Sequence, residues 1–123
     1  METNDRERIF DKAGEVGRLI AATAEYRTLK SAHREIGDDR ESTGMLNRMR
    51  ELQESIIGYL GRDEEPPHEL EQELAALTER VQENPRFRSL ITAQERFDEL
   101  RERIDEAIGR GIVAGEKSGI IVP

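Results

Sequence analysis

Apolar side chains recur at helical spacing along almost the whole chain, and no useful length alternates with the two-residue period of a strand. This pattern predicts an all-α protein with about five amphipathic helices that form a helical bundle, completed by oligomerisation. The predicted helical segments are one that carries Ile9 to Ala24, one from Thr23 to about Ile36, one from about Ser42 to Leu60, one from about Pro67 to Glu83, and one from about Pro85 to Gly109.

Capping residues set the expected boundaries of these segments. Thr23 is a candidate N-cap for the second segment. The sequence leaves open whether the first two segments are continuous or kinked near Thr23. Ser42 or Thr43 is expected to cap the third segment. Gly61 is expected to end it, and Pro85 suits the first position of the fifth.

The chain after residue 110 differs from the rest. Four glycines and two β-branched patches follow Ile108, so residues 111–123 are expected to form a non-helical, Gly-rich apolar tail after a helical domain over residues 1–110. Disorder is one interpretation of this tail. The other is a docking hypothesis, in which the tail binds a neighbouring chain or closes the chain's own core through Ile120, Ile121 and Val122.

Composition narrows the class of protein. Leu, Ile, Val and Phe together make up about 23% of the 123 residues, not far above the level of about 20% that is typical of disordered chains. We therefore expect a thin core, and small proteins with such a core commonly bury further apolar area by associating with another chain. The absence of cysteine excludes disulfides, zinc fingers and thiolate-bound iron–sulfur clusters within this chain.

The charge of the chain bears on its partners and location. A net charge of −8 argues against direct nucleic-acid binding, which draws on Lys and Arg. Residues 62–83 hold eight acidic and two basic side chains, which suit a basic partner or simply a solvated helix face. The charged start is unlike a signal peptide, and no stretch is apolar enough for a membrane span. A cytoplasmic protein without membrane contact is expected.

No motif survives as a catalytic, metal or cofactor site. Glu65 and His68 match a Glu-x-x-His ligand pair, but two prolines separate them and no second copy exists. Residues 109–114 match a dinucleotide fingerprint, but a helix precedes them where a strand is required. His33 has no recognisable nucleophile or acid partner. We expect no enzymatic activity and no cofactor.

The third and fifth segments instead carry apolar residues on more than one face, which indicates a shared interface. The candidate interface residues, some of which must also serve the monomer core, are Leu52, Ile56, Tyr59, Leu90, Phe97, Leu100 and Ile104.

The chain resembles the YlbF/YmcA (Com_YlbF) family of small helical bacterial proteins over about residues 9–108. In the second half, Asn84-Pro85 and the apolar positions after it resemble the family's ending. The positions that carry the resemblance are Ala13, Leu19, Ile20, Thr23, Tyr26, Leu29 and Ala32, then Asn84, Pro85, Phe87, Leu90, Ala93, Leu100, Ile104 and Ile108.

This resemblance implies a non-enzymatic all-α homo- or hetero-oligomer. Named members regulate competence, sporulation and biofilm formation in a complex that modulates an RNA-processing endoribonuclease and carries cysteine-bound iron–sulfur clusters. Because this chain has no cysteine, the cluster role does not transfer to it. The implied partners are a second copy, a paralogous helical subunit or an endoribonuclease. The alternative is a structural or scaffold protein whose apolar tail docks into a larger assembly.

Overall fold

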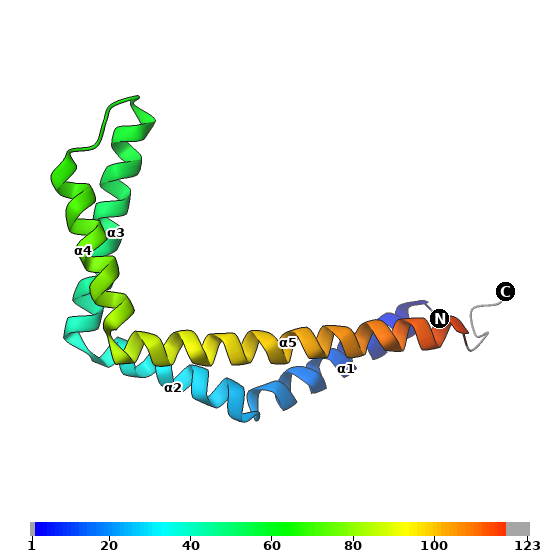
Figure 1. Cartoon of the computed structure of the whole chain (residues 1–123). Coiled ribbons are helices and arrows are strands. Elements are labelled where there is room, and N and C mark those ends of the chain that lie inside the picture. Colours follow the sequence, from blue (N-terminus) through cyan, green and yellow to red (C-terminus); the bar gives the residue numbers. More distant parts are fainter. Residues whose placement is uncertain (1, 118–123) are drawn as a thin grey trace. The chain divides into compact units, whose positions relative to one another are not determined.

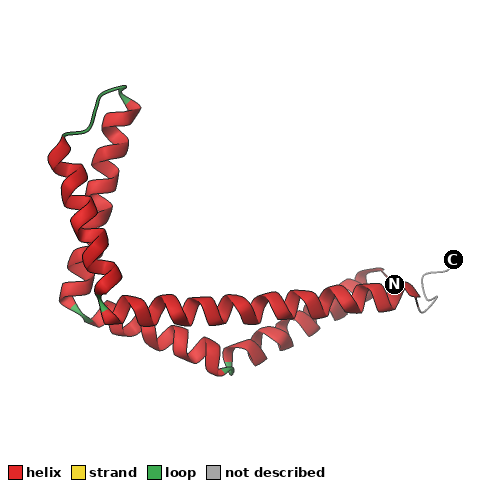
Figure 2. Cartoon of the chain, viewed as in Figure 1, coloured by secondary structure: helices red, strands yellow, loops and turns green. Residues whose placement is uncertain are grey.

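The computed structural model describes residues 2–117, with side chains from residue 4 onward, and this range contains five helices and no strand (Figures 1 and 2). The prediction of an all-α fold with five helices is confirmed. The helices are α1 (Glu2–Ala21), α2 (Ala24–Asp38), α3 (Arg40–Gly61), α4 (His68–Glu83) and α5 (Pro85–Lys117).

The break between α1 and α2 lies at the residue expected to cap α2. The Thr23 hydroxyl accepts a hydrogen bond from the amide of Tyr26 at 3.2 Å and donates one to the carbonyl of Ile20 at 2.7 Å. One side chain therefore serves the last turn of α1 and the first turn of α2. The two segments are separate helices, with Thr23 as the N-cap of α2.

The cap of α3 was predicted wrongly. Asp39, and not Ser42 or Thr43, is the N-cap, since its side chain accepts from the amide of Ser42 and the helix begins at Arg40. Ser42 instead lies inside the first turn and is fully buried. Asp, Ser and Thr are all favoured at the N-cap, so the sequence alone did not decide between Asp39, Ser42 and Thr43.

The C-terminus of α3 forms a Schellman motif. The amide of Glu64 donates to the carbonyl of Tyr59 at 2.9 Å, and the amide of Asp63 donates to Leu60 at 3.1 Å. Asp63 itself has a φ of 56°, which is the left-handed conformation that glycine adopts most easily. Gly61 is the last helical residue, as expected, but the residue in the left-handed conformation is Asp63, two positions later.

Helix α5 continues to Lys117, eight residues beyond the predicted end at Gly109. The expectation that residues 111–117 are non-helical is therefore wrong. Each glycine costs a helix about 1 kcal/mol relative to alanine, but extending an existing helix gains a hydrogen bond per residue without a new nucleus. Residues 118–123, including Ile120, Ile121 and Val122, lie outside the described residues.

The chain divides into two compact units, to both of which α2 and α5 contribute. The hairpin unit is Lys30–Thr92, in which α3 and α4 lie side by side as an antiparallel pair (Figure 1). Its core centres on Leu52, which is 1% exposed. The other buried members are Ile36, Met45, Leu77 and Phe87, and the half-buried Met49, Leu70, Leu74, Val81 and Leu90 pack against them.

The terminal unit is Met1–Leu29 with Ala93–Pro123. Among its described side chains, only those of Leu29 and Ala93 are buried. Tyr26 and Phe97 pack with their ring centroids 5.8 Å apart, at a tilt of 56°. The described part of this unit therefore has one aromatic contact and two buried side chains, whereas the hairpin unit has a cluster of five buried apolar residues.

We predict that Leu52→Ala lowers the free energy of unfolding by about 2–5 kcal/mol, because it leaves a cavity in the hairpin core. Urea titration followed by circular dichroism measures this change. Leu60→Ala is the matched control on the same helix, since Leu60 is 59% exposed. Equal losses in both variants would contradict the assigned core.

We also predict that Asp63→Gly raises the free energy of unfolding by up to about 1 kcal/mol, because glycine adopts the left-handed conformation without strain. Thermal melting of the variant measures the gain. Glu64→Gly, one residue later and outside the left-handed region, serves as the control. A melting temperature for Asp63→Gly below that of the parent chain would refute the assigned turn.

Candidate protein-interaction surfaces

Large apolar side chains are exposed along α1 and α5 in the terminal unit. On α1, Ile9 is 64% exposed, Phe10 68% and Leu19 69%. The remaining exposed positions of this unit are Val16, Ile108, Ile112 and Val113. Single exposed apolar residues are ordinary, whereas adjacent ones mark contact surfaces.

Some of these residues meet in a groove between α1 and α5. We call it the α1–α5 groove, with a volume of about 500 Å³. Ile9 and Val16 on α1 face Ile108 on α5 there, and charged side chains lie at its edge. The lining residues are Asp5, Arg8, Ile9, Lys12, Ala13, Val16 and Ile108.

A second groove, of about 420 Å³, lies between the first turns of α2 and the middle of α5. Its floor includes Ala93 and the half-buried Leu100, one turn beyond Phe97. Its walls carry both signs of charge, from Glu25 and Glu99 and from Arg96 and Arg103. The groove is thus suited to a polar-rimmed helix or loop rather than to a deeply buried small molecule.

The end of the hairpin unit presents a smaller apolar patch. Ile57 is 67% exposed and Leu60 59% exposed on the last turns of α3. Beside them, the Arg62 guanidinium lies over the Tyr59 ring at 4.9 Å and pairs with Glu64 at 3.3 Å. Stacking of this kind holds the tyrosine ring at the hairpin end.

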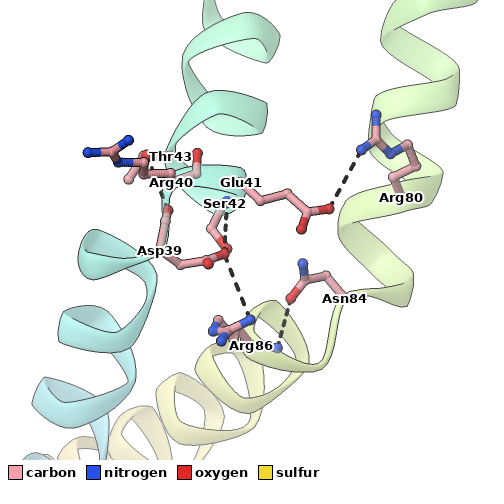
Figure 3. Close-up of polar contacts among 8 residues, drawn as sticks. All are labelled: Asp39, Arg40, Glu41, Ser42, Thr43, Arg80, Asn84 and Arg86. Atoms are coloured by element: carbon pink, nitrogen blue, oxygen red, sulfur yellow. Dashed lines mark hydrogen bonds and ion pairs between the residues drawn. The ribbon is translucent and has the colours of Figure 1, made fainter.

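Polar contacts join α2, α3 and the start of α5 within the hairpin unit (Figure 3). The Asp39 carboxylate accepts from the Ser42 hydroxyl at 2.6 Å and from its amide at 3.0 Å, and Arg86 lies 3.8 Å away. These hydrogen bonds from Ser42, with the charge of Arg86, hold the pKa of Asp39 below its ordinary value against the opposing effect of burial. Asn84 accepts from the Arg86 amide at 2.9 Å.

A second polar contact fastens α3 to α4. Arg48 binds Glu73 in a bidentate manner, with Nη2 donating to Oε1 at 2.8 Å and Nε to Oε2. The hydrogen bonds from Arg48 lower the pKa of Glu73, and the Glu73 and Glu51 carboxylates raise the pKa of Arg48. Such exposed pairs fix orientation more than they add stability.

The predicted interface residues divide between the two units. Leu52 is buried in the hairpin core, so intrachain packing accounts for it, and the half-buried Leu90 packs against the same core. Ile56 and Tyr59 are half-buried on α3. Phe97, Leu100 and Ile104 form a half-buried row on α5 in the terminal unit.

Sequence reasoning missed the exposed row beyond Ile104. The sequence pattern places Ile9 and Ile108 only on apolar helix stripes, assigns Ile112 and Val113 to a tail, and gives Phe10 no role, whereas all five side chains are exposed. The continued 3.6-residue spacing from Ile104 to Ile108 and Ile112 was the available signal.

The motif residues have the surroundings of surface positions. His33 and His68 are both exposed. Residues 109–114 lie within α5, where the dinucleotide fingerprint has no strand or turn. Among the described residues, no group of three or more His, Asp or Glu side chains is placed to hold a metal ion, and no helix is both long and apolar enough to cross a membrane.

Comparison with known proteins assigns the family. Residues 9–113 match the family described as control of competence regulator ComK, YlbF/YmcA. The chain belongs to the YlbF/YmcA family. The match covers both described units, and it extends past the predicted helical domain into the last turns of α5.

Curated relatives of this YlbF/YmcA protein are UPF0342 proteins. One from Streptococcus mutans is 29% identical over 87 residues, which cover 71% of this chain and 77% of the relative. Others from Lactobacillus acidophilus and Leuconostoc mesenteroides are 26% and 21% identical over 104 residues, covering 85% of this chain and 90% and 89% of those relatives.

A solved structure shares the fold. The match is to the crystal structure of Bacillus subtilis RicA in complex with RicF, with a TM-score of 0.75 and 11% sequence identity. The alignment covers 87% of this chain and 95% of the matched chain. At this identity the likeness concerns the fold.

We predict that Asp39→Asn reduces stability at pH 7 and flattens its dependence on acid. A lowered carboxyl pKa stabilises the fold above the ordinary value of about 4, and this contribution is lost as the pH falls through the lower folded-state pKa. Urea titrations between pH 3 and 7 should show the difference between parent and variant shrinking below about pH 4. Asp38→Asn is the control, and a difference that stays constant with pH would contradict the role of Asp39.

Proposed function

We propose that this YlbF/YmcA protein is a non-enzymatic cytoplasmic regulator or adaptor that acts by protein–protein interaction, on RNA processing or developmental control. The description of the family as control of a competence regulator supports a regulatory role. The neighbouring fold of RicA, determined in complex with RicF, supports a protein partner. A second copy of the chain, a paralogous helical subunit or an endoribonuclease is the proposed partner.

One observation carries this proposal: the terminal unit buries only Leu29 and Ala93 among its described side chains while it exposes large apolar residues on α1 and α5. Burial of apolar area is the main stabilising contribution to a fold. A pair of helices with so little buried area gains stability by placing its apolar face against another protein.

The proposed contact residues are Phe97, Leu100 and Ile104 on α5. They form a half-buried row at helical spacing, and Leu100 lines the groove between α2 and α5. The charged walls of that groove, Arg96 and Arg103 against Glu25 and Glu99, would orient a partner helix. In the hairpin unit, Ile56 and Tyr59 are proposed as a second contact region.

We predict that Ile104→Glu weakens self-association by about tenfold or more, because it places a charge at the centre of an apolar contact. Sedimentation equilibrium of the purified chain measures the dissociation constant. Glu106→Lys is the matched control, since the exposed Glu106 lies two residues along α5 and thus about 200° around the helix from Ile104. Equal dissociation constants for the two variants would contradict the assigned face, provided that circular dichroism shows both helical.

The regulatory partner is tested by affinity capture of the tagged chain from its host lysate, with and without ribonuclease. Recovery of an endoribonuclease or a paralogous helical subunit, lost in Ile104→Glu and kept in Glu106→Lys, is the expected result. Recovery of the chain alone would refute the regulatory role and leave a homo-oligomeric scaffold.

A further inference from the structure

The α1–α5 groove has an apolar interior that no described residue covers. Ile9, Val16 and Ile108 are 64%, 37% and 55% exposed there, although they face one another. The volume of about 500 Å³ lies within the range of about 300–1,000 Å³ that ligand-binding clefts occupy. A groove of this size accepts several aliphatic side chains.

The chain supplies an occupant of matching chemistry. Helix α5 ends at Lys117, and the sequence continues as Ser-Gly-Ile-Ile-Val-Pro. Three consecutive aliphatic residues, Ile120 to Val122, thus follow the helix with only Ser118 and Gly119 between Lys117 and Ile120.

The lengths agree with a return to the groove. Ile108 lies nine residues before Lys117, a helical distance of about 14 Å. Ile120 and Val122 lie three and five residues after Lys117, so an extended chain carries them up to about 10 and 17 Å from it. Val122 can therefore reach the level of Ile108, on the stretch of α5 that lies beside α1 (Figure 1).

We propose that residues 118–123 bind the α1–α5 groove of their own chain, through Ile120, Ile121 and Val122. A tethered segment has an effective concentration in the millimolar range, so it outcompetes a free ligand of the same affinity at micromolar concentration. The bound segment covers Ile9 and Ile108 and stabilises the pairing of α1 with α5. It leaves Phe10, Leu19 and the proposed contact row from Phe97 to Ile104 open to a partner. This inference does not depend on the proposed function.

The absence of cysteine from the sequence makes disulfide trapping a direct test. A chain with Lys12→Cys and Pro123→Cys places one thiol at the edge of the groove and one next to the proposed aliphatic contact. A disulfide requires the two Cα atoms to lie within about 7 Å. We expect an intrachain disulfide whose rate of formation does not change with protein concentration.

The matched control carries Asp11→Cys with Pro123→Cys. Asp11 is the neighbour of Lys12 but is not among the lining residues, because successive helical positions turn by about 100°. We expect this disulfide to form at least about tenfold more slowly. Adding Ile120→Asp and Ile121→Asp to the Lys12 pair should slow trapping by about tenfold or more, since each buried isoleucine contributes on that order to binding.

Two results would overturn the proposal. Covalent dimers whose yield rises with concentration would place the segment in the groove of a second copy. Equal trapping rates for the Lys12 and Asp11 pairs would show that the segment does not bind the groove. Hydrogen exchange of α1 in the Ile120→Asp/Ile121→Asp chain is a second readout, with faster exchange at residues 9–16 expected and an unchanged rate against the proposal.

Trapping is read within one chain, so its outcome is separable from that of the assembly experiments. Ile104→Glu can abolish self-association while the Lys12 pair still forms its disulfide. Conversely, loss of trapping with unchanged self-association would refute only the binding of residues 118–123.

Discussion

The small number of apolar side chains is the constraint on which the rest of the structure depends. The hairpin unit holds the more complete cluster, where Leu52 is enclosed by α3, α4 and the parts of α2 and α5 that belong to this unit. The described part of the terminal unit has a tilted ring contact between Tyr26 and Phe97 and the two buried side chains of Leu29 and Ala93. The distribution of burial thus separates a unit with its own core from one with open apolar faces.

Polar contacts fix the orientation of the helices in the hairpin unit, and they add less stability than its apolar core. The bidentate Arg48–Glu73 pair fixes the orientation of α3 against α4. The Asp39–Ser42 cap, with Arg86 beside it, joins the end of α2 to the starts of α3 and α5 within the hairpin unit. Both contacts lie near the surface, where ion pairs orient elements more than they stabilise them. The stability of the unit therefore depends mainly on apolar packing.

The open faces of the terminal unit connect structure to function. In a family described as control of a competence regulator, a helical surface that exposes aliphatic side chains suits the binding of other proteins. The proposed partner face around Ile104 and the proposed self-binding groove around Ile108 are neighbouring parts of α5. They differ in their proposed occupants, which are the chain's own residues 118–123 in the groove and a partner protein at Ile104.

Helix content, helix number and most boundaries followed from the sequence, because the 3.6-residue stripe and local caps such as Thr23 and Pro85 are properties of neighbouring residues. The cap of α3 and the end of α5 did not follow. Several residues before Met45 satisfy the same capping rule, and glycines weaken a helix without setting where an existing one stops.

The sequence by itself determined that this chain is all-α, has a thin core and resembles the YlbF/YmcA family. Only the tertiary structure decided that Leu52 belongs to an intrachain core while Ile9, Ile108 and Ile112 remain exposed. All four occupy apolar positions at helical spacing, and periodicity says only that a face is apolar. Which face is covered depends on the helix packed against it, and that is a property of the fold.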